Sequence, residues 1–208
     1  MSTRLPMFPL GLVMLPHLVV PLHIFETRYR VLMFDCTHGE ANPEFGVVLI
    51  ERGSEVGGND QRFGVGTVAR IVDAAELPDG RWVLTAAGTQ RFRVDEWLPD
   101  DPYPLALIER LPDLPWSPDA ESARQQAEHH VRRAMALSAE LGDPDMPATI
   151  DLHPDPVISS WQLQAIAPVG PFDQQRLLEI DDHGVRLSQL AASAEETARV
   201  LAHRLAGE

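Results

Sequence analysis

Prolines interrupt both apolar segments at the start of the chain, and they limit what these segments can become. Residues 5–10 and 18–24 are short and apolar, and each contains proline. Proline has no N–H to give to a sheet, so a strand that contains it belongs at a sheet edge or a bulge. We therefore expect two short edge strands at the start of a β-rich region.

An amphipathic segment follows the second strand without a gap. Its apolar residues recur at spacings of three and four, which predicts a helix with one buried face. Gly39 is a plausible end for this helix. The predicted buried face comprises Phe25, Tyr29, Leu32, Met33 and Cys36.

The next part of the chain reads as a β-meander. Phe45–Glu51 is a compact apolar strand, and the polar, glycine-rich residues 52–62 are expected to form an exposed loop. Turn residues at 78–80 and a short turn at Gly88 would separate the strands that follow. The remaining predicted strands are 64–77, 81–87, 90–97 and 103–111.

After a proline-rich junction at 111–118, the pattern becomes helical. Ser117 is a suitable N-cap for a long helix that ends at Gly142, and Asp155 for a second helix that runs to Ile166. Further helices are expected from Pro171 and over 186–207. Strands first and helices afterwards indicate an α+β fold, with a β-rich domain at 1–115 and a helical domain at 116–208.

The bulk composition excludes some partners and favours one compartment. The 208-residue chain has a net charge of −14, which opposes binding to nucleic acid and to anionic membranes. Cys36 is the single cysteine, so no intramolecular disulfide can form. We expect a cytoplasmic protein.

The first thirty residues also carry a recognisable pattern. Phe8-Pro9-Leu10, Leu15-Pro16, Pro21 to Glu26 and Arg28-Tyr29-Arg30 resemble the opening signature of the Lon substrate-binding domain family. His17 stands where that family usually has Gly, and Thr27 where it usually has Pro. Looser echoes of the family's later signature follow at 157–161, 173–179 and 185–187.

This resemblance implies a fold and a role. The fold would be a small twisted, PUA-like β-barrel followed by a C-terminal helical bundle. The role would be recognition of exposed or unfolded polypeptide, with client proteins and a separate protease as partners. The oligomeric state stays open.

The absence of lysine argues against catalysis by this chain. All 17 basic residues are arginine. The P-loop of an ATPase needs a lysine at the phosphates, and a Ser–Lys peptidase needs one to activate its serine. We therefore expect a non-enzymatic domain without a cofactor.

The run Leu12, Val13, Met14 and Leu15 is the candidate polypeptide-binding surface. It is unusually apolar for a connection between strands, and methionine adapts to varied partners. The competing interpretation, which we favour, is that the run folds into the core.

The polar and aromatic residues of the signature are expected to be structural. Glu26 would lie in the first helical turn, where a negative charge is stabilised, and Arg28 would bridge the helix to the sheet. The full set is Phe8, Pro9, Pro21, Phe25, Glu26, Arg28 and Tyr29.

Two other functions remain as alternatives. Asp151, His153 and Asp155 could hold a divalent metal in a hydrolase, although Asp155 is better placed as a helix cap. The PUA-like barrel suggests an RNA-binding module, which the acidic charge opposes. Cys36 could be a nucleophile, but its place on an apolar helix face favours the core.

Overall fold

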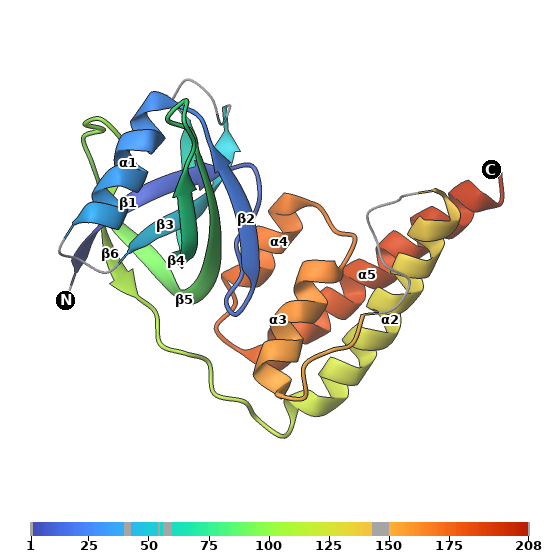
Figure 1. Cartoon of the computed structure of the whole chain (residues 1–208). Coiled ribbons are helices and arrows are strands. Elements are labelled where there is room, and N and C mark those ends of the chain that lie inside the picture. Colours follow the sequence, from blue (N-terminus) through green and yellow to red (C-terminus); the bar gives the residue numbers. More distant parts are fainter. Residues whose placement is uncertain (1, 40–42, 54, 56–59, 143–149, 208) are drawn as a thin grey trace. The chain divides into compact units, whose positions relative to one another are not determined.

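The computed structural model describes residues 2–39, 43–53, 55, 60–142 and 150–207. The chain forms two compact units, Met1–Asp113 and Leu114–Glu208 (Figure 1). Among the described residues, the first unit is built from strands and one helix, and the second from helices alone. The α+β class is therefore confirmed.

The β unit contains a six-stranded sheet in the order β2-β5-β4-β3-β1-β6. β1 and β3 run parallel, and the other strand pairs in the described part of the chain are antiparallel. The elements are β1 (Thr3–Leu10), β2 (Val19–Ile24), α1 (Thr27–His38), β3 (Glu44–Arg52), β4 (Gln61–Glu76), β5 (Trp82–Leu98) and β6 (Leu105–Arg110).

This sheet closes on itself only in part. β6 pairs with residues 3–6 of β1 and also with the second half of β5, which closes a ring of strands. Residues 7–10 of β1 pair only with β3, and β2 pairs only with β5, within the described residues. The unit is thus a barrel that is closed at one end and open between β1 and β2 at the other.

Both faces of β3 are buried over most of its length. Phe45 and Val47 of β3 pack in one cluster with the buried face of α1, whereas Val48 packs in a second cluster with Met7 and Phe92. A strand that is buried on two sides reads as a continuous apolar run, as this one does.

The predicted break of β5 at Gly88 is wrong. β5 runs unbroken from Trp82 to Leu98. A side chain at Gly88 would collide with the backbone carbonyl of Leu15, and the Gly88 carbonyl accepts a 2.9 Å hydrogen bond from the His17 amide. The glycine is needed for this close approach of two chain segments rather than for a turn.

The first helix agrees with the prediction except at its start. Tyr29, Leu32, Met33 and Cys36 are buried, and Gly39 is the C-cap. Phe25 instead precedes the helix and is 57% exposed. Its exposure follows because Glu26 is the N-cap, so Phe25 does not take part in the helical periodicity.

His17 has a positive backbone angle, with φ of 62°. This left-handed region favours glycine, and histidine is among the residues that tolerate it. The geometry gives a physical reason for glycine at this point of the signature.

The helical unit is organised around two long helices. α2 packs along α5, and α3 and α4 pack against α5 (Figure 1). Its core contains Val131, Leu163 and Leu187. Its elements are α2 (Ala120–Glu140), α3 (Pro156–Ile166), α4 (Pro171–Leu178) and α5 (His183–Leu205).

The helix ends in this unit differ in how well the sequence predicted them. The Asp155 carboxylate caps α3 by accepting from the Val157 and Ile158 amides, as expected. α2 begins two residues later than predicted, with Asp119 and not Ser117 at the N-cap. α5 begins at His183, where the Asp182 carboxylate caps it, and not at residue 186.

An arginine lies in the middle of the helical core. Arg186 is 0% exposed, and its guanidinium carbon lies 3.6 Å from the ring centre of Trp161. It donates to Gln164 Oε1 at 2.9 Å and to Ser160 Oγ at 2.8 Å. It also donates to His183 Nδ1 at 2.9 Å, which makes that nitrogen the unprotonated one. These contacts join α3 to α5.

None of the helices in the described part of the chain is both long enough and apolar enough to span a bilayer.

Candidate functional site

A small apolar cavity of about 190 Å³ lies at the open end of the β unit. We call it the β1–β2 cleft. β1 and β2 supply most of its wall, and the rest comes from Leu12, from the start of α1 and from Glu55. Its lining residues are Phe8, Pro9, Leu10, Leu12, Pro21, Leu22, His23, Ile24, Phe25, Glu26, Tyr29 and Glu55.

Tyr29 and Phe8 form the rigid part of this wall. Their rings meet edge to face, with centroids 4.5 Å apart, and both side chains are buried. The Arg28 guanidinium lies over the Tyr29 ring at 4.4 Å from the ring centre. Burial raises the pKa of the Tyr29 hydroxyl, so the ring stays neutral near neutral pH.

Charged groups stand at the rim of the cleft. Arg28 Nε pairs with Glu26 Oε2 at 3.2 Å, and Arg28 Nη2 donates to the Glu55 carbonyl at 3.2 Å. The Glu55 carboxylate accepts from the Gly11 amide. Arg28 therefore joins the start of α1 to the segment after β3, and not to the sheet as expected.

The structure divides the predicted polypeptide-binding run. Met14 and Leu15 are only 2% and 3% exposed, so they belong to the core. Val13 is half-buried. Leu12 is 40% exposed and lines the β1–β2 cleft, which makes it the member of the run that a partner can reach.

Signature residues that were expected to be structural gather around the same cleft. Six of the seven line it, and the seventh, Arg28, contacts three of the lining residues. The interpretation from sequence missed Leu10, Leu22, His23, Ile24 and Glu55. Leu22 and Ile24 alternate with exposed neighbours along β2, a pattern that could have indicated them.

The segment proposed as a metal site forms part of a second, polar hollow. This hollow lies on the helical unit, with Asp151 and His153 in its lining. His153 Nδ1 accepts from the Asp155 amide, and the Asp155 carboxylate is the α3 cap. Among the described residues, no group of three or more His, Cys, Asp or Glu side chains is placed to hold a metal ion.

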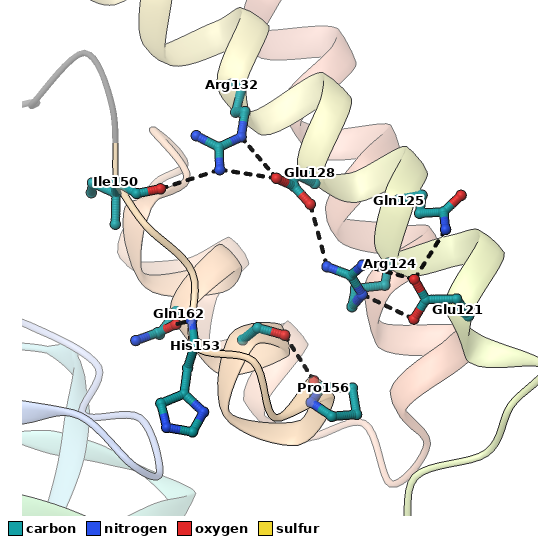
Figure 2. A network of polar contacts seen from close by, with 10 residues as sticks. Glu121, Arg124, Gln125, Glu128, Arg132, Ile150, His153, Pro156 and Gln162 are labelled. Atoms are coloured by element: carbon teal, nitrogen blue, oxygen red, sulfur yellow. Dashed lines mark hydrogen bonds and ion pairs between the residues drawn. The ribbon is translucent and has the colours of Figure 1, made fainter.

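Ion pairs along α2 engage four of the charged side chains that line this hollow (Figure 2). Arg124 bridges Glu121 and Glu128, and Arg132 pairs with Glu128 at 2.9 Å. Arg132 also donates to the Ile150 carbonyl at 3.2 Å. We call this series the α2 ladder.

Cys36 lies in the core, 8% exposed. Its thiol donates to the Glu44 carbonyl, and burial raises the pKa of the thiol to about 12. A thiol that stays protonated is not a nucleophile.

Comparison with known proteins gives consistent matches. The family model for the ATP-dependent protease La (LON) substrate-binding domain matches residues 4–192. The chain is 25% identical to a Lon protease of Cytophaga hutchinsonii over 95% of its own length and 24% of that protein. It is 30% identical to a Lon protease of Methylocella silvestris over 69% of its length and 17% of that protein. The chain thus spans a quarter or less of these relatives.

Two solved structures have a similar fold. The crystal structure of a Lon N-terminal domain protein from Xanthomonas campestris is 28% identical, with a TM-score of 0.63 over 91% of this chain and 98% of that one. The N-terminal domain of the Mycobacterium avium complex Lon protease has a TM-score of 0.64 over 93% of this chain and 99% of that one, at 15% identity. On the family match, the chain belongs to the LON substrate-binding domain family.

Proposed function

We propose that this chain recognises exposed or unfolded polypeptide through the β1–β2 cleft, without catalysis. The observation that carries the proposal is the position of the family signature. Its aromatic and proline residues surround an apolar cavity at the surface, beside the exposed side chains of Leu12 and Phe25. Exposed apolar surface around a hollow is typical of recognition sites.

The shape of the site fits a chain segment better than a compact ligand. Small-molecule pockets enclose about 300–1,000 Å³, whereas this cleft encloses about 190 Å³. A cavity of this size accepts one large apolar side chain of a longer partner. Unfolded chains expose such side chains, and folded proteins bury most of them.

We further propose that the chain works as an adaptor that brings clients to a separate protease. The relatives it matches are Lon proteases, of which it spans a quarter or less. The chain itself contains no lysine for a P-loop or a Ser–Lys pair. Faster degradation of an unfolded client by a Lon protease when this chain is added would support the adaptor role, and an unchanged rate would contradict it.

The test of recognition is fluorescence anisotropy of a labelled, permanently unfolded protein, with its folded parent as a control. We expect saturable binding to the unfolded probe alone. Leu12→Asp places a charge at the cleft and should weaken binding about tenfold, since burying a leucine side chain contributes about 1.5–3 kcal/mol.

Val72→Asp is the matched control. Val72 is 62% exposed on β4 and does not line the cleft. Its variant should bind like the wild type. Equal loss in both variants would place binding elsewhere, and no binding by the wild type would overturn the proposal.

A further inference from the structure

The backbone groups that face the cleft can be identified from hydrogen bonds nearby. The Met7 amide donates to the Pro104 carbonyl at 2.8 Å, on the side away from β3. Backbone groups of a strand alternate in direction, so those of Pro9 face the same side as those of Met7. Leu18 accepts from Gly88 of β5 at 2.8 Å, so Val19, Pro21 and His23 face away from β5 by the same rule.

Proline therefore occupies both edges of the cleft. Pro9 and Pro21 have a carbonyl but no N–H, so at these positions the edges can accept hydrogen bonds and cannot donate them. Proline on a sheet edge opposes continuous pairing with an added strand. The cleft thus offers acceptors to a partner rather than a full strand ladder.

A carboxylate adds to this acceptor character. Glu55 lines the cleft and is exposed. Its carboxylate accepts from the Gly11 amide, and no arginine in the described ranges forms an ion pair with it. The whole chain also carries a net charge of −14. Donor-rich cations complement such a rim.

We propose that the β1–β2 cleft selects extended segments in which one large apolar side chain is flanked by arginine or lysine. The apolar side chain would fill the cavity between Phe8, Leu22 and Tyr29. The basic side chain would donate to the edge carbonyls and to the Glu55 carboxylate. This inference rests on the proposed function and gives it a sequence preference.

The test uses three labelled peptides that share a central phenylalanine and differ only in their flanks, which are Arg, Gln or Glu. Anisotropy titrations with the full chain should rank them in that order. At low salt, the Arg-flanked peptide should bind about threefold to fivefold more tightly than the Gln-flanked peptide, the upper part of the range of a solvent-exposed ion pair. Added salt should reduce this difference.

Glu55→Gln tests the residue directly. The amide oxygen of glutamine can still accept from Gly11, so the variant removes the charge and keeps the local bond. We expect it to abolish most of the preference for Arg flanks and to leave binding of the Gln-flanked peptide unchanged. Glu96→Gln is the control, because it removes the same charge from an exposed position at the closed end of the barrel.

The outcomes separate the inference from the function on which it rests. If the unfolded protein binds but all three peptides have equal affinity, the sequence preference is overturned and the proposed function is not. Equal effects of Glu55→Gln and Glu96→Gln would have the same meaning. Failure of the peptides and of the unfolded protein to bind would overturn both.

Discussion

The β1–β2 cleft and the polar hollow along α2 are both surface depressions, but they use their polar groups in opposite ways. In the hollow, Arg124 and Arg132 are engaged by Glu121 and Glu128 of the same helix (Figure 2). In the cleft, the walls are apolar, and the proline edges and Glu55 retain acceptor capacity. Charged side chains that are already paired within one helix are less available to a partner. We therefore place recognition in the cleft.

The two units also differ in how they bury charge. The helical unit buries Arg186 completely, beside the Trp161 ring and in contact with Gln164 and Ser160. The β unit buries Glu44 between two arginines. A buried charge that loses its partners is costly, so both positions should be stability determinants with no part in recognition.

The largest effect is expected at Arg186. Arg186→Met keeps a long side chain beside Trp161 but leaves Gln164 and Ser160 without their donor. Buried polar groups without partners cost about 1–3 kcal/mol each, so we expect the free energy of unfolding to fall by about 3 kcal/mol. Urea unfolding monitored by circular dichroism measures this free energy.

Arg176→Met is the control for this substitution. The Arg176 side chain is 79% exposed on α4, so its loss should change the unfolding free energy by less than about 0.5 kcal/mol. Similar values for the two variants would show that the buried network contributes nothing. Peptide binding by folded Arg186→Met should equal that of the wild type.

A smaller and pH-dependent effect is expected at Glu44. Its carboxylate meets Arg70 at 2.9 Å and Arg110 at 2.8 Å. Burial alone would raise its pKa, but the hydrogen bonds from Arg110 and Arg70 outweigh burial and hold the pKa below the usual value of 4.5. Glu44→Gln should lower the unfolding free energy by about 2 kcal/mol at neutral pH.

The sign of the pH dependence follows from the lowered pKa. A carboxyl group of this kind stabilises the fold above its unfolded pKa of 4.5, and the contribution is lost as the pH falls through the lower folded value. The gap between wild type and Glu44→Gln should therefore shrink on acidification below 4.5. A gap that is constant with pH would contradict the assignment.

The smallest effect is expected in the α2 ladder. Glu128→Gln removes two ion pairs on the surface of one helix. Such pairs contribute about 0.3–0.5 kcal/mol each, so the unfolding free energy should fall by less than about 1 kcal/mol. Binding of the unfolded probe should not change, and a loss of binding here would transfer recognition to the helical unit.

Local sequence patterns predicted the helices and strands of this fold better than the contacts between distant segments. The buried face of α1 and the Asp155 cap follow from spacing and side-chain chemistry over a few residues. The turn predicted at Gly88 is wrong because glycine is required there by the close approach of the Leu15 backbone, which is distant in sequence. Arg186 gave no local signal of burial, because most of its partners, on Ser160, Trp161 and Gln164, lie on another helix.

The candidate site shows the same limit. The signature residues were found from the sequence, but their grouping around one cavity depends on β1 and β2 ending up on either side of an open barrel. The run from Leu12 to Leu15 could not be divided into core and surface without the bond from Thr67 to the Met14 carbonyl. Spacing along the chain carries no information about such contacts.

The most direct test of the account is methyl NMR of the full chain titrated with a permanently unfolded protein. Leu12, Leu22 and Ile24 line the cleft, whereas Leu177, Leu187 and Leu190 lie in the helical core. We predict that the methyl signals of the first group shift in a saturable way and that those of the second group do not. Shifts confined to the helical unit, or none at saturating concentration of the probe, would contradict recognition by the β1–β2 cleft.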